Sequence, residues 1–156
     1  MGYDSHRFIA GGPIVLGGVR IPSDVRLAGH SDGDAIAHAL TDAILGACGD
    51  RDIGTLFPDT DLANAGRDSI EMLAVAVARA SDRGFLIVNA DVTVIAERPK
   101  ISQHRDAIVI VLERVTGASV NVKAKTNEGM GWIGRGEGLA CIAVATLFPR
   151  DGGILE

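Results

Sequence analysis

Residues 31–47, SDGDAIAHALTDAILGA, hold the strongest secondary-structure signal in the chain, because a polar, glycine-containing start runs into a long apolar face. The apolar positions that follow a helical period are Ile36, Ala37, Leu40, Ile44 and Leu45. Ser31 or Asp32 can accept hydrogen bonds from the first turn, so we predict a helix from there to about Ala47.

Glycine and proline clusters on either side of this helix divide the chain into short elements. Ile14–Leu16 and Val19–Ile21 flank Gly17-Gly18, which predicts a β-hairpin. The other predicted elements are a helix from Asp68 or Ser69 to about Arg83 closed by Gly84, a strand at Ile87–Ile95, a helix from Ser102 to about Val115 closed by Gly117, and strands at Val120–Lys125 and Leu139–Leu147. This order predicts an α+β domain with its helices on one face of a mixed or antiparallel sheet. The last strand is apolar on both faces, which predicts that subunits meet there.

Composition limits the class of protein. The chain has 156 residues, 47% of them hydrophobic, which suits one domain. We expect that domain at residues 1–150 and a disordered tail at 151–156. The net charge is −5, aromatic residues make up 4%, and no block of Lys or Arg stands out, so we expect no nucleic-acid partner. A small anionic substrate remains compatible with this charge if the site holds a metal cation.

The sequence also predicts a location. Cys48 and Cys141 are far apart and form no Cys-x-x-Cys pair, so we interpret them as buried thiols. We find neither a secretory signal nor an apolar stretch long enough for a membrane helix. A cytoplasmic protein without a membrane partner is therefore expected.

A candidate metal site comes from two segments. If Asp4-Ser5-His6 is extended, the side chains of Asp4 and His6 point the same way. Such a pair alone is more often a surface or turn feature. His38 on the predicted helix adds a second imidazole, and one carboxylate with two imidazoles is a ligand set of catalytic zinc. Zinc, manganese and cobalt all accept these ligands, and the ligand types alone do not choose among them.

The helix that carries His38 has two interpretations. Asp34, His38 and Asp42 follow at intervals of four residues and so share one helix face. They form either a solvated face with an acid–histidine pair, or a metal ligand whose orientation is set by the two acids.

Three further segments are candidates for binding. His30 and Ser31 open the predicted helix, where backbone N–H groups favour a phosphate, although Ser31 can also be a simple N-cap. The acidic loop formed by 52–54 and 57–61 is either a solvated turn or a site for sugar hydroxyls. Glu128 is a candidate magnesium ligand and Arg135 a candidate diphosphate ligand beside a glycine-rich loop, 129–138, whose alternative role is that of a flexible connection.

Taken together and in this order, the segments resemble the 2-C-methyl-D-erythritol 2,4-cyclodiphosphate synthase family. The resemblance is carried by residues 2–8 (GYDSHRF), 17–22 (GGVRIP), 30–34 (HSDGD), 38–43 (HALTDA), 52–54 (DIG), 57–61 (FPDTD), 98–100 (RPK), 122–128 (VKAKTNE) and 134–138 (GRGEG). It implies the cyclisation of 4-diphosphocytidyl-2-C-methyl-D-erythritol 2-phosphate with release of CMP, a lyase step of non-mevalonate isoprenoid biosynthesis. It also implies a homotrimer of ferredoxin-like subunits with active sites at the subunit interfaces.

The resemblance further implies a role for individual residues. The metal ligands are Asp4, His6 and His38, with Glu128 holding a second ion, magnesium or manganese, against the substrate diphosphate. The catalytic residues are His30, Lys125, Thr126 and Glu128. The substrate-binding residues are Asp4, His6, His30, Ser31, Asp52, Ile53, Gly54, Phe57, Pro58, Asp59, Thr60, Asp61, Ala96, Pro99, Lys100, Ile101, Ser102, Lys125, Thr126, Asn127, Glu128, Trp132 and Arg135. Trp132 and Arg135 match positions near a central trimer cavity that can hold an isoprenoid diphosphate.

Two rival functions use the same residues. A metal-dependent phosphoesterase would place water at the open metal position and give a linear monophosphate. A non-catalytic trimeric metabolite-binding module would keep the fold without turnover. A triad together with Glu128 favours catalysis, because a binding module has little use for two metal positions.

Overall fold

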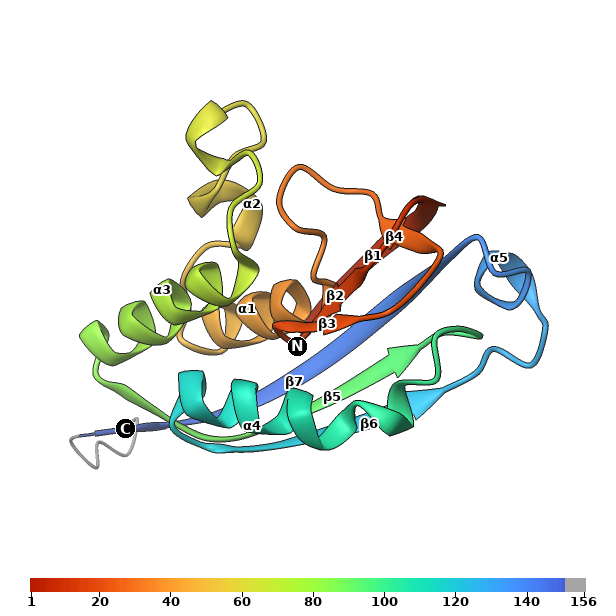
Figure 1. The fold of residues 1–156 in the computed structure, drawn as a ribbon. Coiled ribbons are helices and arrows are strands. Elements are labelled where there is room, and N and C mark those ends of the chain that lie inside the picture. The colour runs from red at the N-terminus through yellow and green to blue at the C-terminus, as the bar shows by residue number, and fades with distance from the viewer. Residues whose placement is uncertain (151–156) are drawn as a thin grey trace.

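The structure is a computed structural model that describes residues 1–150; the predicted disordered tail, 151–156, lies outside the described residues. Five strands form one sheet in the order β4-β1-β7-β5-β6 (Figure 1). Their bounds are β1 Gly2–Ala10, β4 Val25–Leu27, β5 Phe85–Ile95, β6 Ser119–Lys125 and β7 Gly138–Pro149. β5 and β6 run parallel and the other neighbouring strands run antiparallel, so the predicted mixed α+β sheet is confirmed.

The hairpin predicted around Gly17-Gly18 is present. β2 (Ile14–Leu16) pairs antiparallel with β3 (Val19–Ile21), and Leu16 lies opposite Val19. The two turn residues have φ values of 57° and 73°, a conformation that glycine adopts without steric cost. The predicted turn chemistry therefore accounts for this hairpin.

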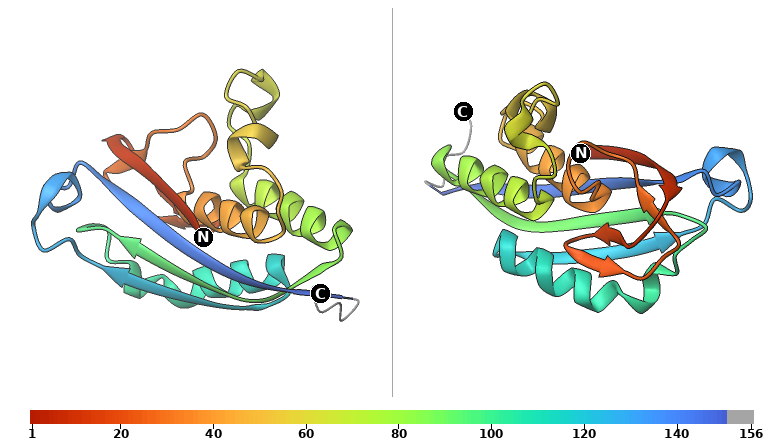
Figure 2. Two further views of the ribbon diagram at one scale, coloured as in Figure 1. Left: turned by 180° about the vertical axis from the view of Figure 1, so that it is seen from behind. Right: turned by 45° about the horizontal axis from the view of Figure 1, so that its top comes forward.

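Three long helices, α1 (Ala35–Ala47), α3 (Ser69–Asp82) and α4 (Arg105–Thr116), lie over one face of the sheet (Figures 1 and 2). The strand residues that face them are buried: Ala90, Val92, Val94, Val120, Val122, Leu139, Cys141 and Ala143. On the opposite face Val88, Val144 and Phe148 are 51%, 49% and 55% exposed. Helices on one face were predicted, and among residues 1–150 no helix covers the part of the other face where these three side chains lie.

The central helix begins later than predicted. α1 starts at Ala35 with Asp34 as its N-cap, whereas Ser31 or Asp32 was expected. Gly33 has a φ of 76°, which no helix interior accommodates, so residues before it cannot belong to the helix. The Asp34 side chain accepts hydrogen bonds from the N–H groups of Ile36 and Ala37. The predicted end at Ala47 is confirmed.

The remaining boundaries differ by a few residues. α4 begins at Arg105 rather than Ser102, because Ile101–Gln103 forms a separate 3-10 turn, η2. Gly84 and Gly117 close α3 and α4 with φ values of 82° and 67°, as predicted. Elements that the sequence did not predict are β4, α2 (Ile53–Leu56), η1 (Leu62–Asn64), η2 and α5 (Gly131–Gly134). β1 entered the sequence analysis only as the condition that residues 4–6 are extended.

The first strand lies unusually close to the central helix. A Cβ atom on Gly2 would lie 1.9 Å from the carbonyl oxygen of Ala39 and 2.7 Å from the nitrogen of Ala43. Glycine and alanine therefore let the backbones of β1 and α1 touch, and this contact brings the side chains of β1 next to those of α1. Among residues 1–150, no helix has both the length and the apolar character that crossing a membrane requires.

Candidate active site

Asp4, His6 and His38 meet where β1 passes the first turns of α1. Asp4 Oδ2 lies 2.9 Å from His6 Nε2 and 3.1 Å from His38 Nδ1. The two ring nitrogens are 3.4 Å apart. Asp4 and His6 project from the helix-facing side of the strand, as the two-residue period predicted, and all three side chains are partly buried. The predicted convergence of these three residues is confirmed.

The ring of His6 is oriented by the backbone. Its Nδ1 lies 2.5 Å from the carbonyl oxygen of Ala28. A carbonyl oxygen accepts but does not donate, so Nδ1 carries the hydrogen and Nε2 keeps its lone pair. Gly29 permits the close approach, because a Cβ there would lie 3.3 Å from His6 Cε1. The free lone pair of His6 consequently points at the Asp4 carboxylate.

The ring of His38 is held from its far side. Its Nε2 lies 2.8 Å from Ser69 Oγ, at the start of α3, and 3.1 Å from Ser31 Oγ. Ser69 Oγ in turn makes a short hydrogen bond to the carboxylate of Asp32. The other ring nitrogen, Nδ1, faces Asp4.

The charges of the three groups depend on one another. Burial alone would raise the pKa of the Asp4 carboxyl, but hydrogen bonds and positive charge from the rings of His38 and His6 in their protonated form outweigh it, so this pKa lies well below its usual range. Burial alone would lower the pKa of His6, but the Asp4 carboxylate stabilises the protonated ring through a hydrogen bond and its negative charge, and so raises this pKa. In the neutral rings the nitrogens that face Asp4 carry lone pairs instead. The carboxylate thus attracts positive charge to the centre.

The donor set fits a divalent metal ion. An ion bound tetrahedrally at about 2.0–2.1 Å separates its ligand atoms by roughly 3.3 Å. The three separations observed are 2.9, 3.1 and 3.4 Å. A carboxylate oxygen and two imidazole lone pairs that face one another repel unless a cation lies between them. Within residues 1–150, these three side chains form the group with metal-ligand geometry.

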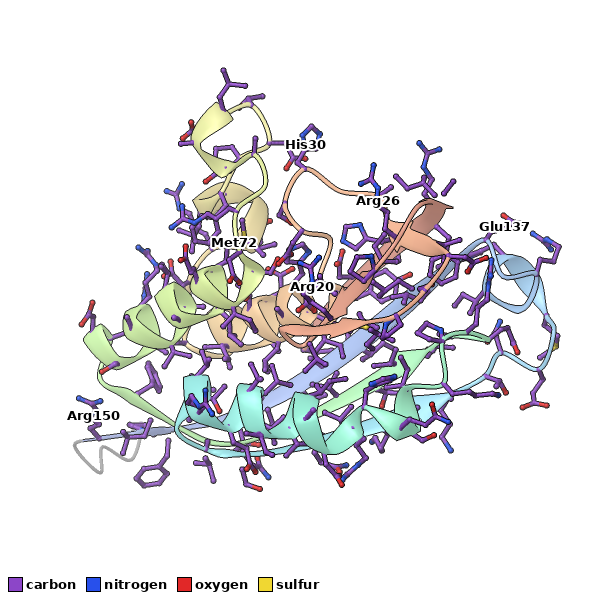
Figure 3. All side chains as sticks on the ribbon, in the orientation of Figure 1. Arg20, Arg26, His30, Met72, Glu137 and Arg150 are labelled. Atoms are coloured by element: carbon purple, nitrogen blue, oxygen red, sulfur yellow. The ribbon has the colours of Figure 1, made fainter. Side chains whose placement is uncertain are left out.

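The centre lies in the wall of a cavity of about 360 Å³. Its lining residues are Asp4, His6, Gly29, His30, Ser31, His38, Ile53, Gly54, Phe57, Asp59, Asn64 and Met72. Figure 3 places His30 on the loop that precedes α1 and Met72 on α3, so segments that are separate in the sequence line the same cavity. Nine of these lining residues belong to the candidate site drawn from the sequence. The structure therefore brings the metal centre and the first group of substrate candidates into one cavity.

Four candidates from the acidic loop lie beside this cavity but do not line it: Asp52, Pro58, Thr60 and Asp61. Asp52 caps α2 by accepting a hydrogen bond from Thr55 N, and Asp61 caps η1 by accepting one from Ala63 N. Pro58 accepts a hydrogen bond from the Asn64 side chain at 3.1 Å. These residues hold the shape of the loop in this chain.

The second group of candidates lies at a different place. None of the described residues after Met72 lines the larger cavity, so Lys125, Glu128 and Arg135 stand apart from it. Ile101 and Ser102 line a smaller cavity of about 130 Å³ between η2, α4 and β6. Candidates outside both cavities in this second group are Ala96, Pro99, Lys100, Lys125, Thr126, Asn127, Glu128, Trp132 and Arg135.

The segment around Glu128 is ordered by carboxylates. Glu128 Oε1 accepts a hydrogen bond of 2.6 Å from Thr126 Oγ1. Glu97 accepts hydrogen bonds from the N–H groups of Asn127 at 2.9 Å and Gly129 at 3.3 Å. Glu128 has a φ of 52°, in the left-handed region that side chains other than glycine adopt rarely. Its side chain is thereby exposed at a fixed bend between β6 and α5.

The interpretation that Asp34 and Asp42 orient His38 is wrong. Asp34 accepts hydrogen bonds from the N–H groups of Gly17 and Gly18 and from the first turn of α1. Asp42 accepts one of 2.8 Å from Ile53 N. Both carboxylates are occupied by backbone groups. On the side of His38 that faces away from Asp4, the acid linked to the ring is Asp32, through Ser69.

Sequence reasoning missed five residues at this site: Gly29, Asp32, Asn64, Ser69 and Met72. Ser69 lies 31 positions from His38, and a contact over that separation leaves no local pattern in a single sequence. Asp32 was considered as a helix cap and not as a partner of His38. The signal that could have found it is the surplus of acids in 31–34, where one helix start needs one cap.

Comparisons with known proteins agree with this geometry. Residues 1–148 match the model of the YgbB family. A 2-C-methyl-D-erythritol 2,4-cyclodiphosphate synthase from Gemmatimonas aurantiaca is 59% identical over 151 residues, which cover 95% of this chain and 91% of that protein.

Two solved structures are similar throughout the fold. The bifunctional IspDF of Campylobacter jejuni superposes with a TM-score of 0.91 and 40% identity, covering 96% of this chain and 42% of that one. A 2C-methyl-D-erythritol-2,4-cyclodiphosphate synthase in its CDP-bound form superposes with a TM-score of 0.86 and 40% identity, covering 94% of this chain and 97% of that one.

Proposed function

This chain belongs to the YgbB family, and we propose that its Asp4–His6–His38 centre and the adjoining cavity form one half of a cyclodiphosphate synthase active site. The enzyme cyclises 4-diphosphocytidyl-2-C-methyl-D-erythritol 2-phosphate to 2-C-methyl-D-erythritol 2,4-cyclodiphosphate and releases CMP, in non-mevalonate isoprenoid biosynthesis. The observation that carries the proposal is the convergence of a carboxylate oxygen and two imidazole nitrogens in the wall of a cavity large enough for part of this substrate.

The reaction makes one bond and breaks one. An oxygen of the 2-phosphate attacks the β-phosphorus, and the bond from that phosphorus to the CMP oxygen breaks. The attacking oxygen is already ionised at neutral pH, so no general base is needed. Both reacting groups are anions, which makes cancelling charge and fixing both ends of a flexible chain the main tasks of the protein.

Asp4, His6 and His38 hold a divalent ion, with zinc the expected occupant. When bound, this ion polarises the β-phosphate as a Lewis acid. The residues themselves contribute orientation: Ala28 fixes the ring of His6, and Ser69 holds the ring of His38. Glu128, exposed at its fixed bend, would hold a second ion, magnesium or manganese, which would neutralise charge on the diphosphate.

The residues of the larger cavity hold the erythritol phosphate and the ribose. Ser31 Oγ accepts a hydrogen bond from Gly33 N and stands 3.1 Å from His38 Nε2, so its own proton is free to donate to a phosphate oxygen. His30 lies beside it at the mouth. Asp59 offers acceptors for hydroxyl groups, and the backbone N–H of Gly54, in the first turn of α2, offers a donor. Asp52, Pro58, Thr60 and Asp61 give this wall its shape.

The cytidine end and the diphosphate are held by the second group of residues. We place the cytosine against Ala96 and residues 99–102, where Ile101 and Ser102 line the smaller cavity. Lys125, Thr126 and Asn127 are assigned to the diphosphate, next to Glu128. CDP is the ligand of the similar solved synthase, which supports a cytidine-linked substrate here.

A homotrimer of ferredoxin-like subunits explains why the two groups are apart in one chain. No described residue after Met72 lines the larger cavity, so in this proposal a neighbouring copy supplies the Glu128 segment. The uncovered face of the sheet, which includes Val144 and Phe148, offers the surface for that contact. Trp132 and Arg135 then lie toward the shared axis, where an isoprenoid diphosphate can bind.

The experiment measures products and metal together. With authentic substrate and the two ions, we expect CMP and a cyclic diphosphate by phosphorus NMR, and one triad-bound ion per chain by elemental analysis. His38→Ala should lose that ion and lower CMP release by more than about a hundredfold, and Asp68→Ala, at an exposed helix cap, should change neither. A linear monophosphate product would instead identify a phosphoesterase. Full CMP release by metal-free His38→Ala protein would refute the mechanism.

A further inference from the structure

His38 uses both of its ring nitrogens. Nδ1 points toward Asp4, 3.1 Å from Oδ2. Nε2 points the opposite way, to the start of α3, where Ser69 Oγ lies at 2.8 Å. A neutral imidazole carries one hydrogen, and its partner on either side determines which nitrogen holds it. The partner at Nε2 therefore decides whether the Nδ1 lone pair is available.

The hydroxyl of Ser69 has one hydrogen to donate. Its Oγ makes a hydrogen bond to Asp32 Oδ1, and an ionised carboxylate only accepts, so that hydrogen is directed to Asp32. Ser69 Oγ must then accept from His38, which places the imidazole hydrogen on Nε2. The lone pair is left on Nδ1, where it faces the Asp4–His6 pair.

Asp32 is held in place by the backbone. Its Oδ2 accepts a hydrogen bond of 3.1 Å from Ser69 N, and its Oδ1 accepts one of 3.1 Å from Asp34 N. The carboxylate also sits at the N-terminus of α3, whose dipole favours a negative charge. Ser69 itself is fully buried, with a relative exposure of 0%. The chain from Asp32 through Ser69 to His38 is thus built into the packing between α1 and α3.

We propose that Asp32 and Ser69 are positioning residues for the metal ligand His38: they fix its Nε2–H tautomer and its ring orientation, so that the Nδ1 lone pair points at the ion. The inference rests on the proposed metal centre and deepens it. It gives His38 the arrangement that His6 receives from the Ala28 carbonyl. The two histidines coordinate through different ring nitrogens, because their hydrogen-bond partners lie on different sides.

Capping of α3 does not explain this arrangement. Asp68 is the N-cap of that helix and accepts a hydrogen bond of 2.8 Å from Ile70 N. Removing either acid would weaken the same helix end, but only the removal of the Asp32–Ser69 pair would affect His38. Asp68→Ala is consequently a matched control for the stability of this segment.

The first measurement is on the wild-type protein. Nitrogen NMR of the zinc-loaded enzyme, labelled at its histidines, reports which ring nitrogen of His38 carries the hydrogen. We expect the hydrogen on Nε2. A hydrogen on Nδ1 would overturn the proposal without any variant being made.

The second measurement is zinc affinity, from competition with a chromophoric chelator and without substrate. Ser69→Ala should weaken zinc binding by roughly 10–100-fold, the usual effect of losing a partner behind a metal-bound histidine. Asp32→Asn should weaken it less, because the Ser69 hydroxyl remains. Ser69→Thr, which keeps a hydroxyl, should stay within about threefold of wild type, as should Asp68→Ala.

Failure of the positioning role and failure of the proposed metal centre give different results. A folded Ser69→Ala protein whose zinc affinity and His38 tautomer equal those of wild type would reject the positioning role and leave the metal centre intact. Wild-type protein that binds no divalent ion would reject the metal centre itself. If Ser69→Ala does not fold, Ser69→Cys keeps the volume with a weak acceptor and should give the same loss of affinity.

Discussion

The carboxylate of Asp34 accepts a hydrogen bond of 2.8 Å from the backbone N–H of Gly17, in the turn of the β2–β3 hairpin. Its second oxygen accepts one of 2.7 Å from Gly18, and the first also accepts from the N–H groups of Ile36 and Ala37. One buried side chain thereby joins the hairpin to the start of the helix that carries His38. Burial raises the pKa of Asp34, and these N–H donors oppose that effect.

Asp34→Ala should lower the free energy of unfolding by at least about 3 kcal/mol. The change leaves four backbone N–H groups without their acceptor, and each buried donor left unpaired costs about 1–3 kcal/mol. Urea denaturation followed by circular dichroism measures the loss. Asp68→Ala removes an exposed cap and should cost about 1 kcal/mol. Equal losses in the two variants would mean that the hairpin contact contributes nothing.

Two glycines near α1 should respond to alanine in opposite ways. At Gly46, within the helix, an added Cβ meets nothing within 4 Å, so Gly46→Ala should raise the free energy of unfolding by about 0.5–1 kcal/mol. At Gly2 the same atom would lie 1.9 Å from the backbone oxygen of Ala39. Gly2→Ala should therefore cost about 1–3 kcal/mol and move β1 away from α1.

Zinc affinity tests whether Gly2→Ala loses stability because β1 moves away from α1. Displacement of β1 carries Asp4 and His6 away from His38, so zinc binding should weaken together with stability. Gly46→Ala should bind zinc as the wild type does. Gly2→Ala protein of unchanged stability and unchanged zinc affinity would show that the contact of β1 with α1 does not set the geometry of the centre.

Much of the fold was predictable, because its signals are local. The hairpin follows from Gly17-Gly18, and the ends of α3 and α4 follow from Gly84 and Gly117. The joint position of Asp4 and His6 follows from the two-residue period of a strand. For Asp4, His6 and His38, the residue types of two segments predicted a shared ligand set, and the structure brings the three side chains together with metal-ligand geometry.

The parts that were not predicted depend on contacts between distant segments. Asp32, Asp34 and Asp42 look alike in sequence, yet one binds Ser69, one binds the hairpin and one binds Ile53 N. Helical spacing predicted that Asp34 and Asp42 contact His38. Both carboxylates instead accept hydrogen bonds from backbone N–H groups of other segments. Composition and period contain no information about which N–H group a buried acid will meet.

Stability should depend on pH through Asp50, which lies between α1 and α3. Its side chain is 1% exposed and accepts from Arg79 at 2.6 Å and Arg83 at 3.0 Å. The hydrogen bond from Arg79, with that from Arg51 N, holds the pKa of Asp50 well below its ordinary value of 3.8. A carboxyl whose pKa is lowered on folding stabilises the fold above that ordinary value, and the stabilisation is lost as the pH falls toward the folded-state pKa.

Asp50→Asn should accordingly unfold at lower urea than wild type near pH 7, and the difference should shrink as the pH falls below 3.8. Denaturation curves at several pH values measure this. The control is Asp106→Asn, since Asp106 is 91% exposed in its ion pair with Arg105 and should have little effect at any pH. A difference for Asp50→Asn that stays constant down to about pH 2 would contradict the assignment.

A substitution on the exposed sheet face should reduce catalysis without weakening metal binding. The triad comes from β1 and α1 of one chain, whereas the Glu128 segment has to come from a neighbouring copy under the proposed trimer. Val144→Lys adds charge to that face, where Val144 is 49% exposed. We expect monomers by light scattering and zinc affinity within about threefold of wild type. CMP release should fall by more than about a hundredfold, because positioning the two reacting ends can be worth ~7–11 kcal/mol.

The control is Ile110→Lys, on the outer side of α4 and 57% exposed, which should leave assembly and turnover unchanged. A monomeric Val144→Lys protein with full turnover would place the whole active site within one chain.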